Sequence, residues 1–152
     1  MKIIAHRANL NGPDLNVENR ISSISNCIDS GFEVEIDVRL VNGKLYLGHD
    51  NPDQIITKRE LDQIKNKLWI HCKNLDAFTF FNKINEKFNY FWHETDSYTL
   101  TSQGYIWTYP GKTLSSRCIC VMPELKQPIK EMSFLKNNEI AGICTDYPNL
   151  IK

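Results

Sequence analysis

The 152-residue sequence predicts an α/β fold built on a largely parallel sheet. Short apolar runs typical of β-strands alternate with segments at helical spacing, and this alternation indicates strands joined by crossover helices. All four histidines, His6, His49, His71 and His93, stand at the end of such an apolar run. Parallel-sheet enzymes gather their catalytic groups at the C-terminal strand ends. A single strand-end histidine is more often structural, so it is the joint placement that favours a site.

In the first half of the chain, apolar runs and turn signals outline two strands, a helix and a hairpin. Residues 2–6 form the first predicted strand, and isoleucines at helical spacing predict a helix over residues 18–30. Apolar and polar residues then alternate over residues 32–40, which predicts a second strand. Asn42-Gly43 is a two-residue hairpin signal, and it predicts a returning strand over residues 44–48.

This hairpin has a consequence for His49. Ideal pairing about the turn places Ile36 opposite His49, and paired residues share a face of the sheet. Strict register would therefore direct His49 away from Asp37. We expect a bulge or a bend at Gly48 to bring His49 back, because glycine tolerates the backbone angles that such a change needs.

The second half continues the alternation of helices and strands. Thr57 and Glu60 match a capping box that opens a helix, and Asn74 is placed to cap another that reaches about residue 88. The aromatic stripe of this second helix predicts a core contact. The remaining predicted elements are strands at residues 68–73, 89–93, 105–108, 117–122 and 140–145, and a helix near residues 129–138.

Composition favours a single globular domain over residues 1–152. Basic and acidic residues number 18 each, and a net charge of zero argues against nucleic acid bound through bulk electrostatics. No apolar run approaches the ~20 residues of a membrane helix, and the N-terminus shows no secretory signal. Four of the five cysteines lie in apolar runs, which favours reduced, buried thiols and a cytoplasmic location.

The second predicted strand carries two acids on one face. Glu35 and Asp37 are two residues apart, so they lie opposite the apolar residues of the same strand. If that apolar face packs on helices, both carboxylates face the interior of the fold, where a divalent cation or a shared proton must relieve their repulsion. A half-solvated antiparallel strand with both acids in water fits the alternation equally well.

Several short motifs resemble one family. They are His6-Arg7 after an apolar strand, Glu18-Asn19, Glu35-Ile36-Asp37, Gly48-His49-Asp50 and Thr145-Asp146-Tyr147-Pro148. Their residues and order resemble the glycerophosphodiester phosphodiesterase family, among the phospholipase-C-like phosphodiesterases, with Ala8 where that family usually has glycine. The resemblance implies a TIM-barrel-like (β/α)-barrel, mostly parallel with a hairpin after the second strand. Such barrels typically take ~250 residues, so we expect a compact, trimmed barrel with missing crossover helices and an open mouth.

The resemblance also implies an activity, the metal-dependent hydrolysis of a small soluble phosphodiester such as a glycerophosphodiester. By the resemblance, His6 and His49 are the acid–base pair, Glu35 and Asp37 bind the divalent metal, and Arg7 holds the phosphate. Mg²⁺ or Ca²⁺ is the expected metal, with Mn²⁺ or Zn²⁺ as alternatives. Two other functions remain open: a phosphodiester lyase that yields a cyclic phosphate, and a non-catalytic module that binds phosphorylated ligands. The sequence leaves the oligomeric state open.

The third predicted strand departs from the family. The family usually has an acidic metal ligand two residues before a lysine, and here His71 stands in that place before Lys73. We expect His71 to be the third metal ligand and Lys73 to contact the substrate. An imidazole ligand shifts metal preference from calcium toward manganese, zinc or iron. His93, Glu94 and Asp96, at the end of the next strand, are the alternative third ligands.

Overall fold

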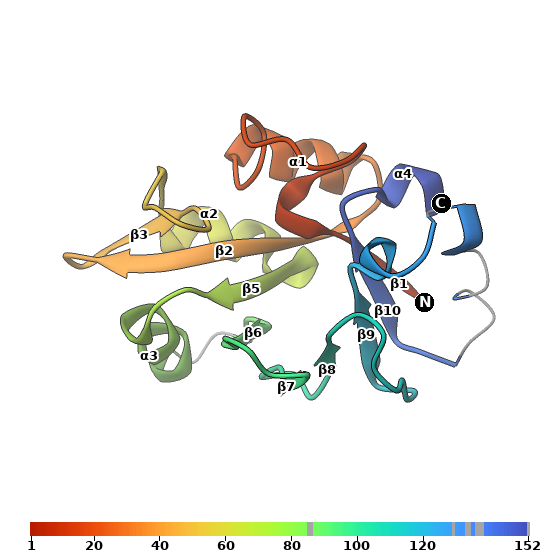
Figure 1. The fold of residues 1–152 in the computed structure, drawn as a ribbon. Helices are drawn as coiled ribbons and strands as arrows, with labels where there is room; N and C mark the ends of the chain where they lie inside the picture. The colour runs from red at the N-terminus through yellow and green to blue at the C-terminus, as the bar shows by residue number, and fades with distance from the viewer. Residues whose placement is uncertain (85–86, 129, 133–134, 136–138, 152) are drawn as a thin grey trace.

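The computed structural model describes residues 1–84, 87–128, 130–132, 135 and 139–151 (Figure 1). Within them, ten strands form one mixed sheet. The strands are β1 (Lys2–Ala5), β2 (Glu33–Val41), β3 (Lys44–Leu47), β4 (Gln54–Ile56), β5 (Leu68–Cys72), β6 (Tyr90–Phe91), β7 (Tyr98–Leu100), β8 (Ile106–Thr108), β9 (Cys118–Val121) and β10 (Gly142–Thr145).

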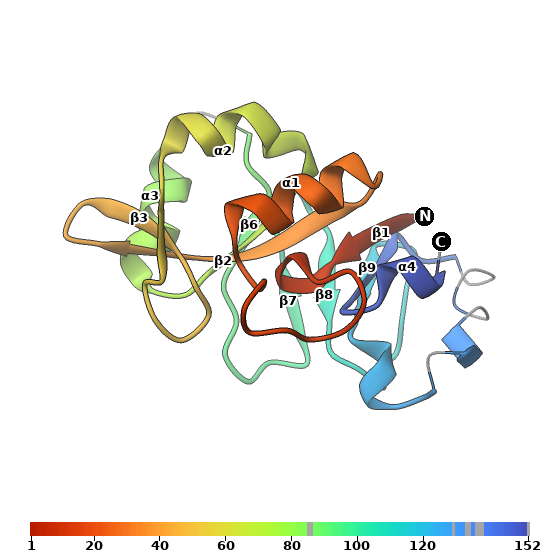
Figure 2. The same ribbon diagram turned by 90° about the horizontal axis from the view of Figure 1, so that it is seen from above.

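Short helices connect these strands. The α-helices of the described residues are α1 (Ile21–Asp29), α2 (Lys58–Ile64), α3 (Leu75–Lys83) and α4 (Pro148–Ile151), and the 3₁₀ turns are η1 (His6–Ala8), η2 (Lys65–Lys67) and η3 (Pro123–Leu125). The N- and C-termini lie at the same end of the molecule (Figures 1 and 2).

The sheet is parallel along its centre and antiparallel at its margins. Every pairing along the path β8-β9-β10-β1-β2-β5-β6 is parallel. The hairpin strand β3 pairs antiparallel with β2, β4 pairs antiparallel with β3, and β7 pairs antiparallel with β8. A mixed α/β fold with mostly parallel strands and a hairpin after the second strand is therefore confirmed.

Closure into a barrel is not seen. The parallel path ends at β6 and β8, and no ladder joins these two strands in the described part of the chain. They do come close, because the Phe91 and Trp107 ring centroids are 4.5 Å apart. The free edge of β8 is taken by β7, so the edge that a closing strand would need is already paired. The predicted trimmed barrel is thus an open, curved sheet.

The two faces of this sheet bury different clusters. On the outer face, Val34, Ile36 and Ile70 pack against residues of α1, α2 and α3: Ile24, Cys27, Leu61, Ala77 and Phe81. On the inner face, Trp69 and Phe91 are buried with Ile4, Trp107, Ile119, Val121 and Cys144. This arrangement turns the acids of β2 inward rather than into water.

The hairpin after β2 ends at a bend. Leu40 pairs with Leu45 and Val38 with Leu47, as the predicted register requires, and the pairing stops there. Gly48 then adopts φ +141°, and a Cβ at this position would lie 2.0 Å from the Asn51 carbonyl oxygen. Only glycine fits such a position. The predicted break at Gly48 is therefore a bend after the strand rather than a bulge within it.

Several predicted elements have different bounds in the structure. The first helix begins at Ile21 rather than residue 18, and α3 ends at Lys83 rather than about residue 88. Strands β4 and β7 and helix α4 were not predicted. Residues 92–117, all of them described, contain no helix, in agreement with the trimmed crossovers expected. The predicted helix at 129–138 lies largely outside the described residues.

All five cysteines, Cys27, Cys72, Cys118, Cys120 and Cys144, are free and buried, as their apolar neighbours predict. Among the described helices, none is long and apolar enough to cross a membrane.

Candidate active site

A cleft of about 450 Å³ lies at the C-terminal ends of the parallel strands. Glu35 and Asp37 line it from within β2, and residues at or near the ends of β1, β3, β5, β6, β8 and β9 complete it. The cleft brings together all seven residues for which the sequence predicts a role: His6, Arg7, Glu35, Asp37, His49, His71 and Lys73.

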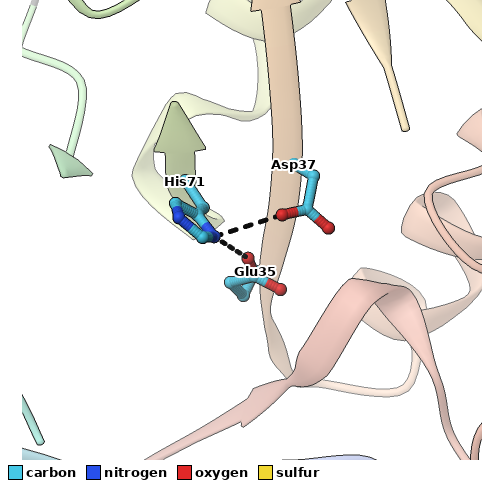
Figure 3. A group of neighbouring side chains, drawn as sticks. All are labelled: Glu35, Asp37 and His71. Carbon is cyan, nitrogen blue, oxygen red and sulfur yellow. Dashed lines mark ion pairs between the residues drawn. The ribbon is translucent and has the colours of Figure 1, made fainter. Parts of the chain in front are cut away.

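Glu35, Asp37 and His71 form a buried group that fits a metal ion (Figure 3). The two acids project from β2 and the imidazole from the neighbouring strand β5, where Asp37 pairs with His71 in the ladder. His71 Nδ1 lies 3.2 Å from Asp37 Oδ1 and 3.8 Å from Glu35 Oε1. One ligand atom from each residue lies within 4.8 Å of the other two, so a single ion can contact all three.

In each of the two acids, one carboxylate oxygen accepts a hydrogen bond from the protein and the other faces His71. Asp37 Oδ2 accepts a hydrogen bond from Asn19 Nδ2 at 2.9 Å, and Glu35 Oε2 accepts one from the Arg7 backbone N–H at 2.9 Å. The other oxygen of each acid faces His71, and Asp37 Oδ1 is buried with no hydrogen-bond partner. A buried carboxylate oxygen without a donor is costly, and a cation beside it removes that cost.

The charges of the two acids also call for a cation. Burial and the neighbouring Asp37 charge raise the pKa of Glu35. Burial acts to raise the pKa of Asp37 as well, but His71, Arg7 and Lys73 outweigh it and hold that pKa well below its usual range. The ionised form of Glu35 is thus disfavoured by burial and by the Asp37 charge, and a cation beside it would offset both effects. The residues present therefore fit a divalent cation.

Arg7 and Lys73 supply the positive charge beside this group. Arg7 Nε lies 3.4 Å from Asp37 Oδ2, and Arg7 Nη1 lies 3.3 Å from Glu18 Oε2. Lys73 Nζ lies 3.8 Å from Asp37 Oδ1. Burial acts to lower the pKa of Arg7, but the surrounding acids outweigh it and raise that pKa, so the guanidinium stays charged. A planar, charged guanidinium in a cleft suits a phosphate group.

His6 is oriented by an acid from the other end of the chain. Its Nδ1 lies 2.8 Å from Asp146 Oδ1, which follows β10, the parallel neighbour of β1. Asn9 Nδ2 donates to the same oxygen at 2.8 Å. Burial acts to lower the pKa of His6, but the bond to Asp146 and the charge of Glu35 outweigh it and raise that pKa. With Nδ1 engaged, Nε2 is the nitrogen left for a substrate.

His49 lies in a less enclosed part of the cleft. Its Nδ1 lies 2.7 Å from the exposed Asp50 carboxylate, and its backbone carbonyl accepts a hydrogen bond from the Arg39 guanidinium. Partial burial lowers the pKa of His49, and the charge of Arg7 acts in the same direction. The pKa values of His6 and His49 are therefore displaced in opposite directions.

His71 lies in a stack of rings. The centroid of the His93 ring lies 4.5 Å from that of the His71 ring, and the centroid of the Phe91 ring lies 5.1 Å from it. Both rings are nearly parallel to the His71 ring. Burial, with His71 and Lys73 nearby, lowers the pKa of His93 to about 4, so its ring is neutral at pH 7. Glu94 and Asp96 are both exposed. The described ligand atoms thus group around His71 and leave out the alternative ligands His93, Glu94 and Asp96.

Sequence reasoning gave no role to the residues that hold the site in place. Glu18 pairs with Arg7, Asn19 holds Asp37 through both its amide atoms, and Asp146 holds His6. Asn19 has φ +54°, and Arg7 and Ala8 also have positive φ. The left-handed backbone at Ala8 accounts for the glycine usual there in the family that the sequence resembles. The sequence signal for these residues is that Glu18, Asn19 and Asp146 belong to the motifs that resemble the family.

Comparison with known proteins gives one informative likeness. No protein-family model matches the sequence, and no curated protein matches it. Among solved structures, the fold is similar to the crystal structure of glycerophosphodiester phosphodiesterase from Agrobacterium tumefaciens str. C58. The match has a TM-score of 0.54 and 14% identity, and it covers 99% of each chain. The resemblance seen in the motifs is thereby confirmed at the level of the fold.

Proposed function

We propose that this chain is a metal-dependent phosphodiesterase that hydrolyses a small soluble phosphodiester, with glycerophosphodiesters as the first substrate class to test. One observation carries the proposal. Glu35 and Asp37 each have one oxygen held by a protein donor and one facing His71 Nδ1, in a cleft that also holds His6, His49 and Arg7. The similarity of the fold to a glycerophosphodiester phosphodiesterase supports it.

The charged residues would divide the work of binding. Glu35, Asp37 and His71 would hold the divalent cation, which when bound neutralises the charge of the phosphate and polarises it toward attack. Arg7 would bind a non-bridging phosphate oxygen, because its guanidinium is charged and lies beside Asp37. Lys73, also beside Asp37, would add a second positive charge at the phosphate.

The two histidines would move the protons. His6, whose pKa is raised, is the better general acid, and its Nε2 would donate a proton to the leaving alcohol oxygen. His49, whose pKa is lowered, is more often neutral near pH 7, and it would take the proton of the attacking water. Asp146 would keep His6 in one tautomer and orientation throughout.

A substrate screen tests the proposal. Metal-stripped protein is supplied in turn with Mg²⁺, Ca²⁺, Mn²⁺ and Zn²⁺ and incubated with a panel of phosphodiesters, and phosphomonoester and cyclic products are measured separately. Metal-dependent release of a phosphomonoester and an alcohol is the expected result. A cyclic phosphate would show a lyase instead. Binding of diesters without turnover, under all four metals, would identify a non-catalytic module.

A further inference from the structure

The cleft has two chemically different halves. The charged residues come from β1, β2, β3 and β5, whereas the segments from β6 to η3 contribute apolar and aromatic side chains: Trp92, Trp107, Tyr109, Pro110, Met122 and Leu125. Trp107 is buried and forms part of the floor, but Tyr109 is 43% exposed and Leu125 63% exposed. Among the described lining residues of this half, Glu94 alone carries a full charge, and it would repel an anionic group.

Leu125 is held at the rim by its neighbours. The 3₁₀ turn η3 follows Met122, whose φ is +42°, and the Leu125 N–H donates to the Met122 carbonyl at 3.1 Å. Glu124 anchors the turn, because its Oε1 accepts hydrogen bonds from Thr145 Oγ1 and the Asp146 N–H, each at 2.9 Å. This anchor is next to Asp146, the acid that holds His6, and it places Leu125 in the lining of the cleft that His6 also lines.

The apolar half adjoins the group formed by Glu35, Asp37 and His71. The Tyr109 ring meets the His93 ring edge-on at 5.8 Å, and His93 stacks on His71 at 4.5 Å. His71 Nδ1 lies 3.2 Å from Asp37 Oδ1. Both sides line the same cleft, so a phosphate held beside Asp37 has room for one substituent on the charged side and for the other toward Tyr109 and Leu125.

We infer that the substrate is an asymmetric phosphodiester, in which one alcohol is polar and the other carries an uncharged hydrocarbon group. The hydrocarbon group packs on Tyr109, Leu125 and Met122, where its burial stabilises the complex by removing apolar surface from water on both sides. This inference rests on the proposed function, because it assigns the substrate class of the same cleft. It makes Leu125 and Tyr109 specificity-determining residues.

Two matched diesters test the inference. Glycerol phosphodiesters of hexanol and of diethylene glycol have second substituents of equal length and charge, and they differ in polarity alone. The expected kcat/KM for the hexyl diester is at least about 10-fold higher, the size of effect that a few methylenes in an apolar pocket produce. Leu125→Ser and Tyr109→Ala should each reduce this preference by at least about threefold. Leu150→Ser is the control, since Leu150 is 64% exposed outside the cleft.

Binding of the same pair to the metal-free protein, measured by titration calorimetry, separates this inference from the proposed function. If neither diester is hydrolysed, the proposed function fails, and a tighter Kd for the hexyl diester that Leu125→Ser weakens still supports the apolar subsite. Equal kcat/KM and equal Kd for the two diesters, no detectable binding of either without turnover, or a preference unchanged in Leu125→Ser, would overturn the inference.

Discussion

The two carboxylate oxygens of Asp37 have different neighbours. Oδ2 is held by Asn19 and lies near Arg7, while Oδ1 faces His71 and Lys73 without a hydrogen bond. The first oxygen fixes the side chain and the second is free for a cation. The proposed metal centre therefore depends on this one residue for both position and charge.

Asp37→Asn should abolish metal-dependent activity and leave the fold intact. The amide keeps the size of the side chain but loses the charge that binds a cation. Loss of a ligand should lower metal affinity by more than the about 10- to 100-fold that loss of a supporting residue costs. Titration calorimetry with each metal measures the affinity, and circular dichroism checks the fold. Full activity of this variant in the presence of a chelator would contradict the proposed metal dependence.

His71→Glu tests the nitrogen ligand. A third carboxylate should keep metal binding and shift preference toward the harder ions Mg²⁺ and Ca²⁺. Without metal, the added charge beside two buried acids should lower the melting temperature, and Ca²⁺ should restore it. His71→Gln is the matched uncharged control. An unchanged metal preference with a lowered melting temperature would assign His71 a structural role.

The opposite pKa displacements of His6 and His49 predict a bell-shaped pH–rate profile, whose two limbs lie on either side of the ordinary histidine pKa of 6.5. His6 must be protonated to act as the acid, so the rate falls as pH rises through its raised pKa. His49 must be neutral to act as the base, so the rate falls as pH drops through its lowered pKa. Asp146→Asn should move the alkaline limb toward lower pH, because it removes the bond that raises the His6 pKa. Near-normal turnover in His49→Ala would contradict the pairing.

At the scale of elements, the bend after β3 controls the position of His49. The Gly48 N–H donates to the Asp37 carbonyl at 3.1 Å, and the next residue is His49. A side chain at Gly48 meets both an unfavourable φ and the Asn51 carbonyl, whereas Gly43, with φ +75°, has nothing within 4 Å of such a Cβ. The two glycines thus differ both in backbone angle and in what surrounds them.

Gly48→Ala should therefore cost more stability and more activity than Gly43→Ala. The control variant should lose about 1 kcal/mol, the ordinary cost of a left-handed alanine. Gly48→Ala should lose at least about 2 kcal/mol, because backbone strain and a close contact add together. It should also lower kcat/KM by displacing His49. Urea unfolding and steady-state kinetics measure the two effects, and equal losses in both variants would contradict the role of the bend.

Strong local patterns made the main elements predictable. The alternation in β2, the Asn42-Gly43 turn and the capping box at Thr57 are each encoded within a few neighbouring residues, and the structure contains all three. β4 and β7 have three residues each and depend on ladder partners, so no local pattern marks them. The bond between His6 and Asp146 joins residues 140 positions apart, so the periodicity and turn signals of the sequence do not reveal it, and only the motifs that contain the two residues point to them.

At the scale of the whole molecule, the segments that leave the sheet open also line one side of the cleft. The short connections from β6 to β9 leave the sheet unclosed, because β7 occupies the edge of β8. The same segments carry the aromatic and apolar half of the cleft. The charged strand ends are thus in place although residues 92–117 contain no helix, and these residues line the side of the cleft that would face the alcohol of the proposed substrate.

The most direct test of the proposed phosphodiesterase follows one phosphodiester by ³¹P NMR. A glycerophosphodiester is incubated first with metal-stripped protein and then with added Mg²⁺, Ca²⁺, Mn²⁺ or Zn²⁺, beside Asp37→Asn under the same conditions, and each reaction is stopped with excess chelator before its spectrum is recorded. The diester signal should persist until metal is added, then give way to a phosphomonoester signal with the wild-type chain alone. A diester signal that is unchanged by Mg²⁺, Ca²⁺, Mn²⁺ and Zn²⁺, or that disappears in the presence of chelator, would contradict the account.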